Sequence, residues 1–197
     1  MQYQQIIYDL NNPFASEEEV NQAIKLGKQL PLKGVCVSPF WAKKVAREFQ
    51  DKTLIIQSYA GTLNDLTQIK VFAMKELIKV GVNDIISTLN IGAFRTNSGW
   101  CKIECLQLSE TAHAQEVLHT LKIPASPLNN NEIEKVVSIC NQTGIDTLML
   151  QEIHLDQVTL VRENISSDIE LSIQTSDQNI LKMPFETVNL SSESIQP

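Results

Sequence analysis

Short runs of β-branched and apolar residues alternate with longer stretches of helical periodicity along most of the chain. The runs that predict strands are residues 5–9, 34–39, 53–58, 84–91, 116–123, 146–150, 170–174 and 187–190. Helical spacing predicts helices over residues 17–30, 41–49, 66–80, 100–114, 131–143 and 154–163. Strands that alternate with helices are typical of βαβ units, so the sequence predicts an α/β protein with a parallel sheet.

The number of strand candidates favours a closed (β/α)₈ TIM-type barrel, and a doubly wound open sheet is the alternative. The chain has 197 residues, whereas such barrels usually have about 250. The missing length lies after residue 150, so the last helices are expected to be reduced or absent. We expect one compact domain over residues 1–197, with residues 190–197 as a frayed tail.

The charge pattern excludes several partners. The formal net charge is −7, and sixteen Lys and Arg residues are scattered among twenty-three acidic ones. No basic stripe could neutralise phosphates of a nucleic acid. The chain also shows neither a signal-like start nor an apolar stretch long enough to cross a bilayer. We therefore expect a cytoplasmic protein that binds neither nucleic acid nor membranes.

The four cysteines, Cys36, Cys101, Cys105 and Cys140, lie in apolar or helical contexts and are expected to be reduced thiols. Cys101 and Cys105 could share one helix face, but no histidine lies at ligand spacing from them. The sequence therefore predicts no metal site.

Three segments carry a resemblance to a known family: GVCVSPFWAKKVA at residues 34–46, KVFAMKELIKVGVNDIISTLNIGAF at residues 70–94 and LNNNEIEKVVSICNQTGIDTLML at residues 128–150. Their order and spacing resemble the deoxyribose-phosphate aldolases over about residues 8–150, with a weaker match to Ser192. The resemblance implies a (β/α)₈ class I aldolase without a cofactor, which joins acetaldehyde to glyceraldehyde 3-phosphate through a lysine imine.

The resemblance also implies that the family's catalytic groups are missing. Met149 stands where the family has its imine-forming lysine, Ile86 where it has an acid/base aspartate, and Ser172 where it has a second lysine. Imine formation needs a neutral amine and proton transfer needs a titratable group, and these three side chains supply neither.

The family's phosphate site is at best half kept. Thr175 and Ser176 stand where the resemblance places a glycine pair that offers backbone N–H groups to phosphate. Ser191 and Ser192 match the family's two serines after the eighth strand.

The resemblance places Met149 and Ile86 inside the barrel, and side-chain alternation from them predicts which other strand residues face its interior. The predicted inward set is mostly polar: Asp9, Asn11, Cys36, Ser38, Gln57, Thr88, Asn90, Lys122, Gln151, Ser172, Gln174, Asn189 and Ser191. These groups either satisfy one another and buried water, or they line a small-molecule pocket. The candidate ligand-binding residues are Asn11, Cys36, Asn90, Gln151, Gln174, Ser191 and Ser192.

Lys122 lies two residues along from the place where the resemblance puts a fifth-strand lysine. It is either a relocated reactive amine or a solvent-facing or ion-paired lysine, with Asp9 as the expected partner. Asp9 keeps the family's first-strand aspartate.

Three hypotheses follow. The first is a non-catalytic barrel that binds a small polar or phosphorylated metabolite or a protein partner. The second is a lyase with altered chemistry that uses Lys122 and Asp9 on a carbonyl or phosphosugar substrate. The third is a scaffold with a filled interior. The sequence leaves the oligomeric state open, a homodimer included.

Overall fold

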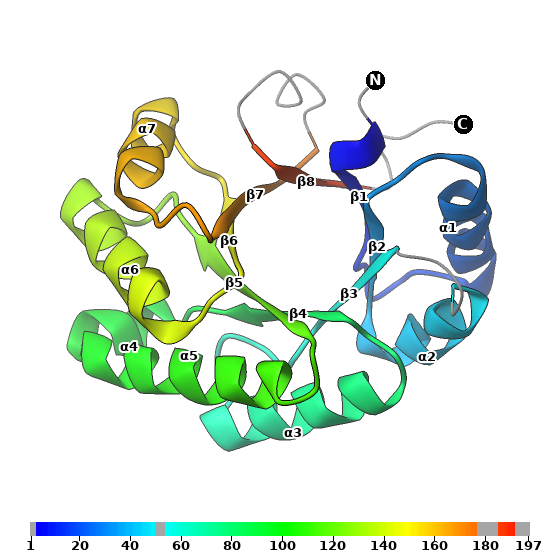
Figure 1. The fold of residues 1–197 in the computed structure, drawn as a ribbon, viewed down its shortest axis with the longest axis horizontal. Coiled ribbons are helices and arrows are strands. Elements are labelled where there is room, and N and C mark those ends of the chain that lie inside the picture. The colour runs from blue at the N-terminus through cyan, green and yellow to red at the C-terminus, as the bar shows by residue number, and fades with distance from the viewer. Residues whose placement is uncertain (1–2, 50–53, 177–184, 192–197) are drawn as a thin grey trace.

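Eight parallel strands form a closed barrel in the computed structural model, which describes residues 3–49, 54–176 and 185–191 (Figure 1). The strands are β1 (Ile6–Leu10), β2 (Gly34–Val37), β3 (Ile55–Tyr59), β4 (Asp84–Thr88), β5 (Leu118–Pro124), β6 (Thr147–Gln151), β7 (Glu170–Thr175) and β8 (Thr187–Ser191). Strand β1 pairs with β2 on one side and with β8 on the other, which closes the ring. The predicted TIM-type barrel is confirmed, and the open-sheet alternative is wrong.

The helices surround the barrel as an outer layer (Figure 1). They are α1 (Glu17–Gln29), α2 (Pro39–Glu48), α3 (Thr67–Lys79), α4 (Ile91–Thr96), α5 (Ser98–His113), α6 (Asn130–Thr143) and α7 (Leu155–Asn164), and a short 3₁₀ turn, η1 (Tyr3–Gln5), precedes β1. Ser16 and Glu19 form the predicted capping box of α1. No helix in the described part of the chain is long and apolar enough to cross a membrane.

The end of β4 differs from the prediction of a strand over residues 84–91. The strand stops at Thr88 because Asn90 caps a short helix: its side chain accepts a hydrogen bond from the Ala93 backbone N–H at 2.9 Å. This helix, α4, was not predicted, and α5 then begins at Ser98 instead of residue 100.

The chain after the sixth strand is short. Helix α7 has only ten residues, in line with the expected reduction after the sixth strand. Most of the β7–β8 connection, residues 177–184, lies outside the described residues, as do residues 192–197. The expected frayed tail begins too early, because Leu190 and Ser191 belong to β8 and pair with Tyr8 and Asp9 of β1.

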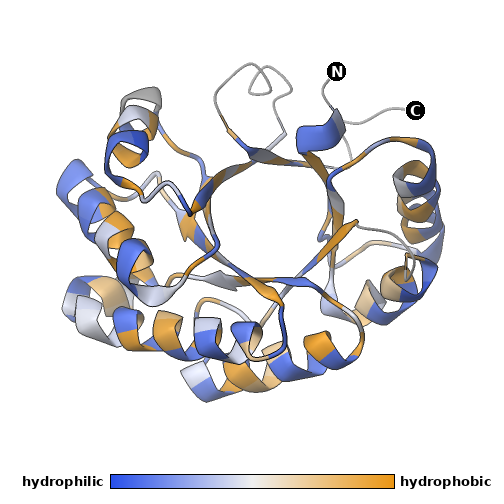
Figure 2. Ribbon diagram, viewed as in Figure 1, coloured by the Kyte–Doolittle hydropathy of each residue, from blue (hydrophilic) through white to orange (hydrophobic). Residues whose placement is uncertain are grey.

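Polar and apolar residues alternate along the strands (Figure 2), as expected of a barrel wall whose two faces differ in polarity. The apolar residues that alternation turns toward the helices belong to the main hydrophobic core: Val35, Val37, Ile85, Leu148, Leu150, Leu171, Ile173, Val188 and Leu190. A second, smaller apolar cluster of Ile7, Cys36, Ile86 and Met149 is separate from it. The predicted side-chain alternation is therefore confirmed, and the small cluster marks the barrel interior.

The four cysteines are buried free thiols, as expected. His119, in contrast, lies buried on the helix side of β5, between the hydroxyls of Ser87 at 2.7 Å and Ser109 at 2.9 Å. Burial lowers the pKa of His119 to about 3, so its ring is neutral and its role is structural.

Candidate functional site

Inward side chains stack in layers of four, each layer drawn from alternate strands, because the strands tilt across the barrel axis. The strand register places four residues of the odd-numbered strands in one layer near the carboxyl ends of the strands, here called the upper layer: Asp9, Tyr59, Lys122 and Gln174. Thr88, Gln151 and Ser191 lie one level above it. Beneath it lie Cys36, Ile86, Met149 and Asn189, and lower still come Ile7, Gln57, Thr120 and Ser172, followed by Gly34, Asp84, Thr147 and Thr187. The interior is thus filled in successive levels.

A chain of buried hydrogen bonds, here called the lower network, runs through the deeper levels. Asp84 accepts from the Gln57 amide and from the Thr120 hydroxyl, each at 2.7 Å, and Asn189 donates to the Gln57 carbonyl oxygen at 2.6 Å. These side chains are no more than 2% exposed. Burial raises the pKa of Asp84 to about 6, while the two donors act in the opposite direction. The polar groups of the lower network therefore hydrogen-bond to one another.

An apolar floor, at the same level as Asn189, separates the rest of this network from the upper layer. It consists of Cys36, Ile86 and Met149, all fully buried and packed with Ile7. Burial, with Asp9 next in importance, raises the pKa of the Cys36 thiol well above its ordinary value. Cys36 is therefore a neutral floor residue and does not line the cavity above it, contrary to its predicted ligand-binding place.

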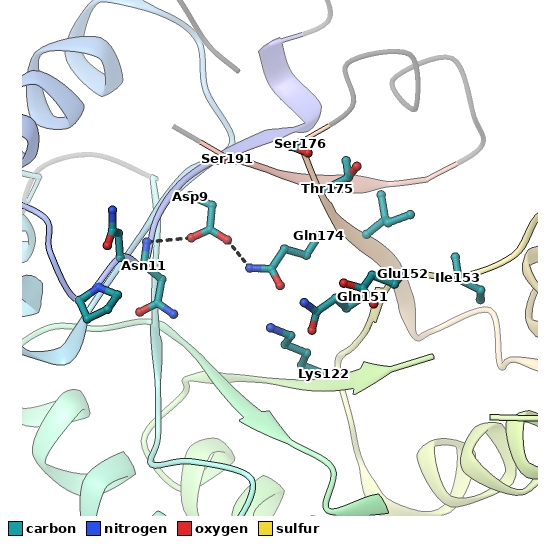
Figure 3. Close-up of a pocket in the computed structure, with 13 residues that line it drawn as sticks. Asp9, Asn11, Lys122, Gln151, Glu152, Ile153, Gln174, Thr175, Ser176 and Ser191 are labelled. Atoms are coloured by element: carbon teal, nitrogen blue, oxygen red, sulfur yellow. Dashed lines mark hydrogen bonds between the residues drawn. The ribbon is translucent and has the colours of Figure 1, made fainter. Parts of the chain in front are cut away.

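Above the floor, a cavity of about 620 Å³ opens at the carboxyl ends of the strands (Figure 3). Its described lining residues are Asp9, Asn11, Asn12, Pro13, Lys122, Gln151, Glu152, Ile153, Ile173, Gln174, Thr175, Ser176 and Ser191. The volume lies within the range of about 300–1,000 Å³ that is usual for small-molecule sites. Active sites of TIM barrels lie at this same end.

Asp9 is held at the cavity wall by neutral donors. Its carboxylate accepts from the Asn11 backbone N–H at 2.9 Å and from the Gln174 amide at 2.6 Å, as the dashed lines in Figure 3 show. The same Gln174 nitrogen donates to the Tyr59 hydroxyl at 3.3 Å. Burial raises the pKa of the Tyr59 phenol well above its ordinary value, so Tyr59 stays protonated.

Lys122 projects into the cavity without an ion pair to any described residue. Its ammonium lies 3.4 Å from the Tyr59 hydroxyl and 5.2 Å from the centroid of the Tyr59 ring. Burial lowers the pKa of Lys122, and the charges of Asp9 and Glu152 oppose that shift. The expected Lys122–Asp9 ion pair is therefore not formed. The two side chains are instead linked through the Tyr59 hydroxyl, which is near Lys122, and the Gln174 amide, which donates to Asp9.

No metal site is evident in the part of the chain that the structure describes, where no three His, Cys, Asp or Glu side chains come together. The cavity instead offers one amine, two carboxylates, amides and hydroxyls, which suit hydrogen bonding to a polar organic ligand.

Several known proteins resemble the chain in sequence. It is 24% identical over 179 residues to a deoxyribose-phosphate aldolase of Clostridium tetani (strain Massachusetts / E88), a match that covers 86% of this chain and 82% of that protein. Deoxyribose-phosphate aldolase 1 of Staphylococcus aureus (strain MRSA252) is 23% identical over 186 residues, covering 89% of this chain and 83% of the relative. The chain is thus similar in sequence to deoxyribose-phosphate aldolases over most of its length. No family model matches it.

Solved structures share the fold of this chain. A putative deoxyribose-phosphate aldolase from Coccidioides immitis superposes with a TM-score of 0.87 at 14% identity, over 98% of this chain and 81% of the other. A tetrameric deoxyribose phosphate aldolase from Aeropyrum pernix gives a TM-score of 0.85 at 11% identity, over 96% and 86%. At these sequence identities the structural similarity establishes the barrel fold alone.

The predicted site residues fall into four groups. Asp9, Asn11, Lys122, Gln151, Gln174 and Ser191 come together around the cavity. Cys36 lies in the floor, and Ser192 lies outside the described residues. Asn90 does not line the cavity, because its amide caps α4 and donates to the Leu63 carbonyl oxygen at 2.9 Å.

Two residues of the site were missed by the sequence analysis. Tyr59 faces inward, but the predicted third strand ended one residue before it; extending the alternation from Gln57 would have found it. Glu152 follows the inward-facing Gln151, so alternation predicts that it points away. Its backbone adopts a left-handed conformation with φ of 56°, and it lines the cavity. Nothing in the sequence marks a glutamate for this conformation.

Proposed function

We propose that this barrel binds a small polar metabolite in the cavity and does not carry out the aldol reaction named in its relatives. The observation that carries the proposal is the nature of the floor. The positions that the resemblance assigns to the imine lysine and the acid/base aspartate hold Met149 and Ile86, two fully buried apolar side chains. Ser172, at the position of the second lysine, is also fully buried.

The loss of these groups removes the covalent route. Without an amine at Met149 no imine forms at that point, and Ile86 cannot hold or move a proton. Residual acceleration would come from binding alone. The cavity above the floor nevertheless keeps polar side chains from several strands, and this supports a retained binding role.

Two assays test the proposal on the full chain. Purified protein is expected to show no cleavage of deoxyribose 5-phosphate above background, and Met149→Lys alone is expected not to restore it. In thermal-shift screening, a true ligand at a hundred times its dissociation constant should add about 2.7 kcal/mol to the free energy of unfolding. For a chain of this size that is a rise of roughly 5–11 °C in the midpoint. Clear turnover by the wild type would refute the proposal.

A second candidate function is favoured by Lys122. Its amine faces the cavity, lacks an ion pair within the described residues, and has a pKa lowered by burial. These are the properties of an amine that can attack a carbonyl, with Asp9 as a nearby proton acceptor. Borohydride trapping with small aldehydes, followed by mass spectrometry, tests this function. A reduced adduct at Lys122, absent in Lys122→Met, would favour the enzyme over the binding protein.

A further inference from the structure

The charges around the cavity are unbalanced. Among the described residues that line it, Asp9 and Glu152 carry carboxylates and Lys122 carries the amine. Both carboxylates act on Lys122, since the charge of each raises its pKa against the effect of burial. A ligand group that approaches the Lys122 amine therefore also meets the field of two negative charges.

Glu152 is held in the cavity wall by unusual backbone geometry. Its φ of 56° is a conformation that glycine and asparagine adopt readily and other residues adopt at a cost of about 1 kcal/mol or more. The Ser126 hydroxyl donates to its carboxylate at 3.3 Å. In Figure 3, Glu152 lies on the same side of the cavity as Gln151 and Lys122. The left-handed turn thus brings to the cavity a carboxylate that strand alternation would direct elsewhere.

The cavity wall also has acceptors in need of donors. The Gln174 carbonyl oxygen is buried and has no hydrogen-bond partner among the described residues. Among the described residues, Asp9 accepts hydrogen bonds from neutral donors, which include the Asn11 N–H and the Gln174 amide. A buried acceptor left without a partner costs about 1–3 kcal/mol, so a ligand hydroxyl that donates to Gln174 would be stabilised.

We infer that the cavity takes an uncharged polyhydroxylated compound and that Glu152 excludes the phosphorylated form of the same compound. The inference rests on the proposed binding function and adds the ligand class and the residue that sets it. Hydroxyl groups supply the donors that Gln174, Asp9 and Glu152 accept from. A phosphate supplies only acceptors and brings a charge of about −1.5 to −2, which Glu152 and Asp9 repel.

The β7 end of the cavity agrees with this selection. Thr175 and Ser176 line it at the place where the resemblance puts the glycine pair that receives phosphate. A side chain at each of these positions occupies space that glycine would leave for an oxyanion next to the backbone. Specificity against phosphate therefore comes from repulsion as well as from the missing cradle.

Ribitol and ribitol 5-phosphate form a matched pair of probes for thermal-shift titration of the full chain at low ionic strength. Neither carries a carbonyl, so their binding is independent of any imine chemistry at Lys122. Ribitol is expected to raise the unfolding midpoint of the wild type, and ribitol 5-phosphate is not. In Glu152→Gln, affinity for ribitol 5-phosphate relative to ribitol should rise about tenfold, the size expected when one close like charge is removed.

Glu134→Gln is the control, because Glu134 is an exposed residue of α6 outside the cavity lining and its substitution changes the net charge equally. It should leave the ratio of affinities unchanged. A wild-type preference for ribitol 5-phosphate would overturn the inference while leaving the binding function intact, and so would a ratio that Glu152→Gln does not move. If neither probe shifts the midpoint of either protein, the inference fails, whereas the binding function is decided by the wider thermal-shift screen.

Discussion

The deeper and the outer parts of the barrel interior contain similar side chains in very different states. In the lower network, Gln57 donates to Asp84 and accepts from Asn189, so both ends of its amide are used. In the upper layer, Gln174 donates to Asp9 and Tyr59, but its carbonyl oxygen has no partner among the described residues. Two glutamines on the same barrel wall thus differ in whether their hydrogen bonding is complete.

This difference shows that a polar barrel interior can serve two purposes at once. Below the apolar floor, polar groups hydrogen-bond to one another. Above it, polar groups line an open cavity, where the proposed ligand would meet them. The sequence left two alternatives for the inward polar side chains, which could satisfy one another or line a pocket. The first describes the deeper half of the barrel interior and the second describes the outer half.

The largest expected effect on stability comes from replacing one glutamine in each half of the barrel interior. Gln57→Leu should lower the free energy of unfolding by roughly 3–6 kcal/mol, because it leaves a buried amide of Asn189 and a carboxylate oxygen of Asp84 without partners. Gln174→Leu should cost less than about 1 kcal/mol, since water in the cavity can hydrate Asp9. Urea denaturation of both variants measures the contrast, and equal losses would contradict it.

Removing part of the floor should have the next largest effect. Met149→Ala is expected to lower the free energy of unfolding by about 2–5 kcal/mol, because a fully buried side chain is truncated, whereas Met149→Leu should cost less than about 1.5 kcal/mol. The opened floor should also let a thiol reagent reach Cys36 in the native protein. Denaturation and mass spectrometry of the labelled peptide measure the two effects. Unchanged stability and labelling would show that the floor does not separate the two halves.

A pH effect distinguishes the lower network from the upper layer. The pKa of Asp84 is raised to about 6 in the folded state, against an ordinary value of 3.8. The folded state therefore holds the proton more tightly, and this stabilisation is present at pH 4 and is lost as the pH rises through 6. Between pH 4 and 7 the wild type should lose about 2 kcal/mol relative to Asp84→Asn.

Urea denaturation of the wild type and Asp84→Asn across this range measures the change. Using the difference between the two proteins removes the contributions of other carboxylates, such as Glu132, whose pKa is lowered to about 2 by hydrogen bonds from Arg95. A difference that stays constant with pH would show that Asp84 remains charged in the barrel.

The smallest expected effect is that of Lys122→Met on the ligand-free protein. Lys122 has no ion pair with a described residue, so its loss should change the free energy of unfolding by less than about 1 kcal/mol. The unfolding midpoint should stay within roughly 4 °C of the wild type in a thermal scan. A larger fall would make Lys122 a structural residue and bring the upper layer closer in character to the lower network.

The sequence by itself determined the barrel and the orientation of its strands. Side chains alternate between two faces with a period of two residues whatever their partners are, so the inward positions of Cys36 and Lys122 followed once the resemblance had placed Met149 inside the barrel. The departures came where a local event overrode the pattern, as in the cap formed by Asn90 and the left-handed turn at Glu152.

Only the tertiary structure decided which polar side chains are satisfied. The Gln57–Asn189 bond joins residues 132 positions apart, and the Asp9–Gln174 bond joins residues 165 positions apart. Lys70 is likewise fully buried, because it donates to Glu104 at 2.7 Å and to the Thr88 carbonyl oxygen at 3.1 Å. Whether a hydrogen bond forms depends on differences of a few tenths of an ångström in the donor–acceptor distance. These distances are set only when the barrel closes and brings the strands together. No pattern of neighbouring residues contains that information.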